Sequence, residues 1–276
     1  MPELPEVETI AADLRQRIIG EKIQEVVVHD ARLIRDFPRS VFADCPAPGF
    51  IRAVKNREIQ KIERQGKALI FYLSGGKYIL AHLGMTGQWV LADSAPRAKV
   101  SITLSSGQRL HYNDQRIFGG MTVVADLAKV PYLRGLGPEP LSPGFLRVFQ
   151  AIAMTGIKAP VKSFLLDQHK IAGIGNIYAS EILFRAGIDP RCPVNQITEP
   201  QLRILGKQIV AVLKEAVCQR GTSKRDYLDA SGRQGSFQNY LRVYGRAGKP
   251  CSVCGKPIQR VVQAGRSTFF CSICQK

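Results

Sequence analysis

The sequence predicts an α+β protein with two domains and a cysteine-bearing C-terminal segment, on three observations. Apolar residues recur at helical spacing near the N-terminus, from about residue 5 to residue 19. Short β-type runs separated by Gly-containing breaks then fill residues 22–125. Helical periodicity returns beyond residue 144. With 276 residues, of which 45% are hydrophobic, the chain can give each domain its own core.

The first eight residues, MPELPEVE, carry three carboxylates in a chain whose formal net charge is +17. One interpretation is structural: Pro5 is the first-turn proline of a helix that ends at Gly20, and the carboxylates complement its positive end. The other is chemical. Removal of Met1 would expose the secondary amine of Pro2, which is partly neutral near pH 7 and can form a Schiff base. The octet alone does not decide between them.

The β-type region predicts an antiparallel sandwich, or alternatively a barrel, with the N-terminal helix packed on it. Breaks at Ser74-Gly-Gly and Ser105-Ser-Gly are typical of hairpin turns. The expected strands lie within 23–28, 51–55, 68–73, 77–83, 88–92, 100–104, 109–113 and 121–125.

A Pro/Gly-rich connector marks the domain boundary. The expected divisions are an N-terminal domain 1–130, a hinge 131–143, a helical domain 144–246 and a C-terminal segment 247–276. Helices are expected at 145–154, 161–168, 174–186 and 198–220, the last opening with Thr198 and Gln201 in capping-box spacing. The polar segment 221–240 is too long for an ordinary connection and is expected to be a functional lid, with a disordered segment as the alternative.

Charge points to a polyanionic partner. The chain has 39 Lys and Arg against 22 Asp and Glu, and its pI is about 9.8. Nucleic acid fits better than a membrane, because no apolar run approaches the roughly 18 residues of a membrane span. The acidic N-terminus does not look like a signal peptide, so a cytoplasmic location, associated with the nucleoid, is expected.

Two cysteine pairs give the strongest single motif. Cys251 and Cys254 are followed, after sixteen residues, by Cys271 and Cys274. This spacing predicts a tetrahedral zinc site on two knuckles, structural because four protein ligands leave no open position. Disulfides are the alternative, disfavoured in a reducing compartment. The remaining cysteines, Cys45, Cys192 and Cys218, are expected to be ordinary buried thiols. The segment from Ser231 onward contains no Asp or Glu, so this zinc hairpin should present a positive surface.

The segment 167–178 places Gly173 and Gly175 between two helices. Such a turn can direct backbone N–H groups of the next helix at a phosphate. Glycine needed only for helix packing is the alternative, and the turn alone does not decide between them.

Six motifs, in the same order along the chain, resemble those of bacterial formamidopyrimidine-DNA glycosylases. They are PELPEVET at the N-terminus, HLGMTG at 82–87, YNDQRIFGG at 112–120, GIGNIYASE at 173–181, VYGR at 243–246 and the four-cysteine C-terminus. The resemblance implies a helix-two-turn-helix in the second domain and a zinc-finger β-hairpin at the end. It also implies a DNA-repair enzyme that excises oxidised purines such as 8-oxoguanine and then nicks the strand by β,δ-elimination. Damaged double-stranded DNA is the implied partner, one structural Zn²⁺ the implied cofactor, and a monomer is expected, with DNA bound between the domains.

The resemblance assigns the catalytic roles residue by residue. Pro2 would be the Schiff-base nucleophile and Glu3 the proton donor, with Glu6 holding the Pro2 terminus in place. Lys67 would donate a proton for β-elimination, and Arg266 for δ-elimination.

The resemblance also assigns DNA contacts. Met85, Arg116 and Phe118 would fill the gap left by the everted nucleotide, with Arg116 facing the orphaned cytosine. Loop 221–240 would fold over the everted base. The remaining implied DNA contacts are His82, Lys162, Asn176, Tyr244 and Arg266.

One motif departs from the family pattern. The family usually has proline and arginine where this chain has Gln115 and Ile117. These positions lie in the loop that carries Arg116 and Phe118, here called the wedge loop, which is therefore expected to be less constrained than in the family. Two rivals stay open: the sister enzyme that excises oxidised pyrimidines, and a non-enzymatic binder of damaged DNA.

Overall fold

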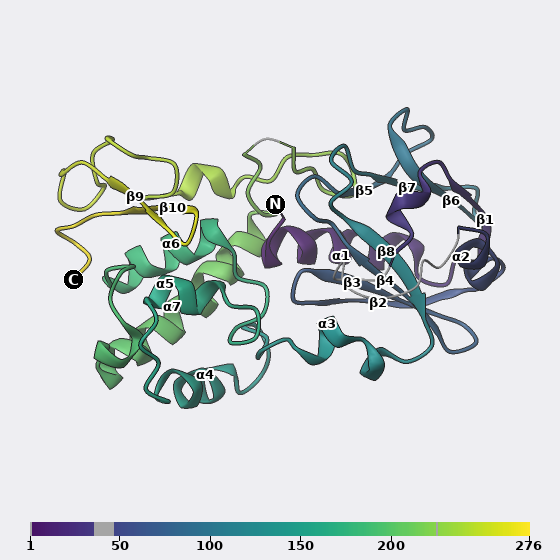
Figure 1. Ribbon diagram of the computed structural model, residues 1–276. Coiled ribbons are helices and arrows are strands. Elements are labelled where there is room, and N and C mark those ends of the chain that lie inside the picture. Colours follow the sequence, from purple (N-terminus) through teal and green to yellow (C-terminus); the bar gives the residue numbers. More distant parts are fainter. Residues whose placement is uncertain (1, 36–46, 225) are drawn as a thin grey trace. The chain divides into compact units, whose positions relative to one another are not determined.

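The computed structural model of the protein describes residues 2–35, 47–224 and 226–276. It divides the chain into two compact units (Figure 1). One comprises Met1–Gly135 with Gln219–Ser236, and the other Leu136–Cys218 with Phe237–Lys276. The segment 219–236 thus groups with the N-terminal unit, whereas the sequence-based boundaries place 221–240 in the helical domain.

The first unit contains two antiparallel four-stranded sheets, which confirms the predicted α+β class and sandwich. One sheet has the order β1 (Ile23–Val28), β6 (Ala98–Leu104), β7 (Arg109–Asn113), β5 (Gln88–Leu91). The other has the order β2 (Ile59–Gln65), β3 (Ala68–Leu73), β4 (Lys77–His82), β8 (Gly120–Val124). Their inner faces share one core, in which the Trp89 ring lies 5.4 Å from Phe71 and 4.9 Å from Tyr112.

Helix α1 (Leu4–Ile18) supplies the predicted apolar stripe to that core. Val7, Ile10 and Leu14 are fully buried, and the helix packs mainly against β2. Because this face is locked, the start of α1 has a fixed position in the first unit.

The strand predicted at 51–55 is wrong. Residues 51–54 lie in helix α2 (Ala47–Val54), which buries Phe50 and Val54 four residues apart on one face, and Lys55 follows the helix in a turn. The adjacent strand β2 was missed because its register shifts between Ile59 and Lys61, so buried residues there are not in strict alternation. The two glycine-containing turns are confirmed as the β3–β4 and β6–β7 hairpins.

The first unit also contains three short helical elements: η1 (Ala31–Leu33), η2 (Leu127–Lys129) and α3 (Pro131–Arg134). The helices of the second unit are α4 (Phe145–Ala153), α5 (Val161–Leu166), α6 (Asn176–Ala186) and α7 (Glu199–Cys218), with η3 (Val194–Gln196) and η4 (Phe237–Tyr240). All four predicted helices are confirmed, with ends displaced by no more than two residues. The Gln201 side chain accepts the Thr198 backbone N–H at 2.9 Å, as the capping spacing predicts.

The C-terminal hairpin pairs β9 (Gln259–Gln263) with β10 (Arg266–Phe270). Of the other cysteines, Cys192 is half-buried and Cys218 is exposed, so the prediction of buried thiols is wrong for Cys218. The reason is that Cys218 ends α7 off its buried stripe. Cys45 lies outside the described residues. Among those that are described, no helix is both long and apolar enough to span a bilayer.

Candidate functional site

The start of α1 gathers the first predicted site residues. Pro2 is buried, and Glu3 and Glu6 are only 3% and 2% exposed. Glu6 Oε2 accepts the backbone N–H of Glu3 at 2.7 Å, which is half of a capping box. The structural interpretation of the octet is therefore confirmed: Pro5 and Glu6 lie in the first turn of a helix. The same hydrogen bond also fixes the peptide immediately after Pro2.

Lys67 lies in the turn directly before β3, and His82 is the last residue of the neighbouring strand β4 of the same sheet. Ala68 pairs with His82 in the β3–β4 ladder, which brings Lys67 close to the end of β4. Lys67 is 6% exposed, and its backbone N–H donates to the Tyr132 hydroxyl at 3.3 Å. His82 Nδ1 accepts the Gly84 N–H at 2.8 Å, so the proton of the neutral ring is on Nε2. Burial of the ring, followed by the nearby Lys67 ammonium, lowers the pKa of His82 to about 3.

This shift predicts acid sensitivity. The unfolded histidine titrates near pH ~6.5 and the folded one near 3, so the unfolded chain takes up the proton first and stability falls as pH drops below about 6.5. The slope from this group is at most about 1.4 kcal/mol per pH unit. We expect His82→Asn, which keeps an acceptor for Gly84, to show a shallower loss of unfolding free energy between about pH 6 and 4, measured by urea titration. His169→Asn, at an exposed histidine, should keep the wild-type slope. An unchanged slope in His82→Asn would contradict the assignment.

Met85, Arg116 and Phe118, the three residues expected to fill the gap left by an everted nucleotide, come together from two loops and form the wedge cluster. Met85 follows β4, and Arg116 and Phe118 follow β7. The Arg116 guanidinium lies 4.5 Å from the centre of the Phe118 ring, and its Nη1 is 3.2 Å from Met85 Sδ. Met85 and Phe118 are 40% and 47% exposed, which is unusual for large apolar side chains. The cluster is thus a preassembled apolar and cationic projection.

Asp114, which is fully buried, accepts hydrogen bonds from the wedge loop. Its Oδ1 accepts the Thr86 hydroxyl at 2.5 Å and the Arg116 N–H at 3.2 Å, and Oδ2 accepts the Gly119 N–H at 2.7 Å. Ile117 has φ +52°, a left-handed conformation that costs a β-branched residue free energy. Asp114 thus contacts three groups of the loops that carry Met85, Arg116 and Phe118.

In the second unit, three elements meet at the carbonyl of Ser267 on β10. Lys162 Nζ and Asn176 Nδ2 both donate to that oxygen at 3.0 Å, and Lys162 also donates to Thr268 Oγ1 at 2.7 Å. Lys162 is only 1% exposed. It therefore links α5 to the hairpin, and any part that it plays in DNA binding would be indirect, through the position of β10.

The predicted glycine turn before α6 is organised by Gln168. Its Oε1 accepts the Gly173 N–H and its Nε2 donates to the Ile174 carbonyl, both at 2.9 Å. Gly173 has φ +83°, which only glycine adopts without strain. Asn176 then opens α6, whose N-cap, Gly175, provides no side-chain cap.

Tyr244 lies just before the C-terminal segment 247–276, and Arg266 lies within it. The fully buried Glu181 of α6 accepts backbone N–H groups of residues 242–244, at 2.9 Å, 3.0 Å and 2.8 Å, and so fixes Tyr244. The Tyr244 ring packs edge-on against Phe269, with 5.2 Å between centroids. Arg266 is exposed at the first position of β10, directly after the hairpin turn.

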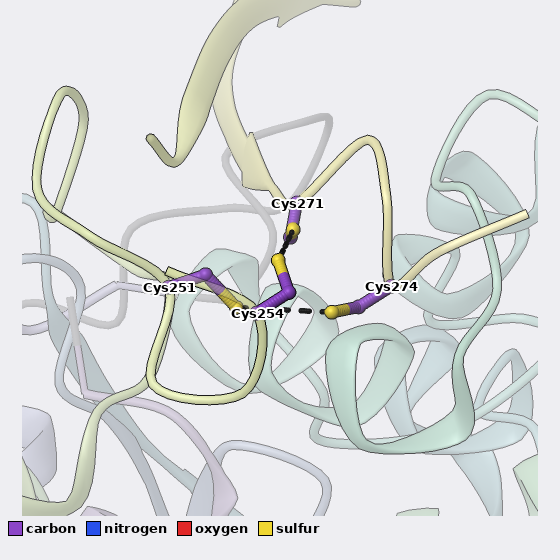
Figure 2. Close-up of side chains that lie close together, drawn as sticks. All are labelled: Cys251, Cys254, Cys271 and Cys274. Atoms are coloured by element: carbon purple, nitrogen blue, oxygen red, sulfur yellow. Dashed lines mark hydrogen bonds between the residues drawn. The ribbon is translucent and has the colours of Figure 1, made fainter. Parts of the chain in front are cut away.

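The four predicted zinc ligands converge (Figure 2). Their Sγ atoms all lie within 4.8 Å of one another, with 3.8 Å between Cys251 and Cys274 and 3.4 Å between Cys254 and Cys271. Tetrahedral zinc with Zn–S bonds of about 2.3 Å requires sulfur separations of about 3.8 Å. A disulfide requires about 2.05 Å, so the disulfide alternative is excluded. The four thiolates form one structural zinc site.

Asp114, Gln168 and Glu181 were not singled out from the sequence. Asp114 and Glu181 lie inside motifs quoted for the resemblance, and Gln168 lies within the segment that carries the glycine turn. Each accepts backbone N–H groups of a functional loop. The sequence signal that could have identified such supporting residues is a polar residue inside or beside a segment already expected to form a glycine turn or a site loop.

Three family models match successive parts of the chain. They describe a formamidopyrimidine-DNA glycosylase N-terminal domain (residues 1–121), the H2TH domain of the same enzymes (136–227) and a zinc finger found in FPG and IleRS (248–276). Together with the fold and the zinc site, they define the class: a zinc-containing DNA glycosylase of base excision repair.

Full-length relatives narrow the class to one family. The chain is 43% identical over 281 residues to formamidopyrimidine-DNA glycosylase from Desulfitobacterium hafniense, with 100% of both chains covered. It superposes on MutM (Fpg) from Thermus thermophilus with a TM-score of 0.86 and 39% identity, covering 99% and 98% of the two chains. Fpg from Lactococcus lactis, in complex with abasic-site DNA, gives a TM-score of 0.88 at 33% identity, covering 99% of each. The chain belongs to the formamidopyrimidine-DNA glycosylase family.

Proposed function

We propose that this protein excises oxidised purines, 8-oxoguanine and formamidopyrimidines, from duplex DNA and then nicks the strand at the abasic sugar. One observation carries the proposal. Buried Pro2 is followed by Glu3 and, three residues later, by Glu6, both at most 3% exposed, and Glu6 accepts the backbone N–H of the peptide after Pro2 at 2.7 Å. A fixed amine beside enclosed carboxylates suits amine addition coupled to proton transfer.

Base removal would begin once Met1 is cleaved. The Pro2 amine attacks C1′ of the damaged nucleotide, the base leaves with the electrons of the glycosidic bond, and the N–H proton lost by the amine passes to the departing base. Glu3 donates a proton to the sugar ring oxygen as the ring opens, and an iminium links Pro2 to C1′. Glu6 is a positioning residue, since its hydrogen bond to the Glu3 N–H sets the direction of the terminus.

Strand cleavage would follow from the same iminium. Loss of a proton from C2′ expels the 3′ phosphate in β-elimination, for which Lys67 is the proposed proton donor. Loss of a proton from C4′ then expels the 5′ phosphate in δ-elimination, with Arg266 as the proposed donor to that phosphate. Water hydrolyses the remaining iminium and regenerates the Pro2 amine.

The wedge cluster would stabilise DNA from which the base has been everted. Unstacking and unpairing a base costs a few kcal/mol, and the exposed Met85 and Phe118 can fill the gap. Arg116, held by both, can offer donors to the orphaned cytosine. Arg266 is exposed on a hairpin that contains no Asp or Glu, so it can bind a phosphate of the repaired strand. His82, Asn176 and Tyr244 are further proposed contacts.

The proposed domains are the N-terminal domain 1–130, the hinge 131–143, the DNA-binding domain 144–246 and the zinc finger 247–276. We propose that the enzyme acts on DNA as a monomer. Chromosomal DNA as the substrate implies action in the bacterial cytoplasm, at the nucleoid.

The substrate class can be tested by single-turnover excision from matched duplexes. We expect 8-oxoguanine opposite cytosine to be excised at least about tenfold faster than thymine glycol, because a site built for one base edge rejects another through unpaired polar groups. An undamaged duplex is the control. Faster excision of thymine glycol would overturn the substrate class in favour of the pyrimidine-specific sister enzyme. Binding without excision of either base would indicate a non-enzymatic binder.

A further inference from the structure

The segment 219–236 lies against helix α1. Arg220 and Gly221 both have left-handed backbones, with φ +59° and +80°. A Cβ at Gly221 would lie 2.8 Å from Glu6 Oε1, so the backbone there is in direct contact with the Glu6 carboxylate. The start of the segment therefore packs directly against the Glu6 side chain of α1, and a side chain at Gly221 would not fit there.

Arg220 links that helix to the far part of the segment. Its Nη2 lies 2.6 Å from Asp13 Oδ2 on α1 and 2.5 Å from Asp229 Oδ2, and its Nε donates to the same Asp229 oxygen at 2.9 Å. Asp229 is fully buried and also accepts the backbone N–H groups of Ser231 and Arg233, at 2.8 Å and 2.9 Å. Hydrogen bonding to Asp13, then to Asp229, raises the pKa of Arg220, so its charge is permanent. We call Asp13, Arg220 and Asp229 the arginine clamp.

Glu6 makes a second connection. Its Oε1 accepts the Thr222 N–H at 2.7 Å while its Oε2 accepts the Glu3 N–H at the same distance. The Tyr227 hydroxyl donates to the Glu6 carbonyl at 3.4 Å. One carboxylate therefore joins the peptide after Pro2 to the segment that follows Arg220. A shift of that segment would be transmitted to the catalytic terminus.

We propose that the arginine clamp positions the 221–236 segment over an everted base and keeps it in register with the helix that carries Pro2 and Glu3. This rests on the proposed function. Arg220 is a positioning residue, since it acts through Asp229 and α1 and not on the reacting atoms. The clamp should matter for excision, in which a base must be held, and much less for nicking at a preformed abasic site, where no base is present.

The test compares the wild type with Arg220→Ala, Asp13→Asn and the double variant, using single-turnover rates on two duplexes. One duplex carries 8-oxoguanine opposite cytosine and the other a preformed abasic site. We expect each single variant to excise 8-oxoguanine about tenfold more slowly while nicking the abasic site within about twofold of the wild type, because misplacing a group costs rate only in the step that uses it. The double variant should be no slower than the slower single variant, because both remove one interaction. Arg32→Ala is the matched control: Arg32 forms a 2.7 Å pair with Asp30 in the same unit, outside the proposed site.

Equal losses on both duplexes would show a general structural role and overturn the proposal, as would no loss on either or a loss confined to the abasic site. Additive effects in the double variant would show that Asp13 and Arg220 act separately, and would also overturn it. A wild-type enzyme that processes neither duplex would instead refute the proposed function, so the two failures are distinguishable. Thermal unfolding of each variant identifies any that fail to fold. If Arg220→Ala does not fold, Asp13→Asn, which keeps the Arg220–Asp229 contact, gives the result.

Discussion

Borohydride trapping on abasic-site DNA is expected to give a covalent adduct through Pro2, and only in chains from which Met1 has been removed. An amide-bonded proline nitrogen has no nucleophilic lone pair, whereas a free secondary amine near its pKa of about 8 does. Pro2 is buried directly before α1, and the next peptide is held by Glu6, so cleavage of the Met1–Pro2 bond would release an amine at a fixed position. Intact mass spectrometry of the trapped product should give the mass of one chain without Met1 plus one DNA strand, and peptide mapping should locate the link in the N-terminal peptide.

Two controls separate Pro2 from its nearest competitor, the amine of Lys67. Lys67→Ala should still be trapped, although its strand nicking should slow, since the proposed role of Lys67 is proton transfer. A chain whose N-terminus is extended by an uncleaved peptide should give no adduct, even if it binds the same DNA. An adduct mapped to a lysine peptide, or one formed equally well by the extended chain, would refute Pro2 as the nucleophile.

Local periodicity was enough to predict the elements that repeat regularly. The stripe on α1 and the one on α7 follow helical spacing without interruption, so both helices were predicted with ends close to those observed. Strand β2 was missed because a register shift near Ile59 breaks its alternation. The apolar residues just before it fit a strand locally but pack as helix α2 against β1, β4 and β8. Such tertiary preferences override local propensity.

The site divides in the same way. The zinc ligands follow from spacing alone, because each knuckle is local. The supporting residues do not, because their partners are remote in sequence: Arg220 reaches an aspartate 207 positions away, and Glu181 binds a segment about 60 positions downstream. The burial of Lys162 could not be predicted from the sequence either, because its partner Thr268 on β10 is remote along the chain. Side-chain support of this kind becomes visible only when the fold brings the partners together.

Replacing a zinc ligand is expected to unfold the C-terminal hairpin and to weaken DNA binding, while the first unit stays folded. Structural zinc contributes about 10–16 kcal/mol to the folding of small domains, and a two-stranded hairpin is marginal without such support. The core around Cys251 and Cys271 is small, with Phe184, Val243 and Ile258 as its other buried members, so packing alone cannot replace the metal. Cys254→Ser should therefore lose zinc, and with it the proposed contact between Arg266 and a phosphate. The measurements are zinc content per chain, protease resistance of residues 247–276 and DNA affinity as a function of salt.

Cys218→Ser is the matched control, because Cys218 is an exposed cysteine at the end of α7, outside the cluster. It should retain one zinc per chain and wild-type DNA affinity. In Cys254→Ser the salt dependence of binding should also become shallower, since each phosphate that a basic side chain neutralises contributes about one to the slope. Protease sensitivity should appear only in the hairpin, because the sandwich core contains none of these cysteines. Full DNA affinity in a zinc-free variant would show that the hairpin does not hold DNA, and Arg266 would then lose its proposed part in both binding and δ-elimination.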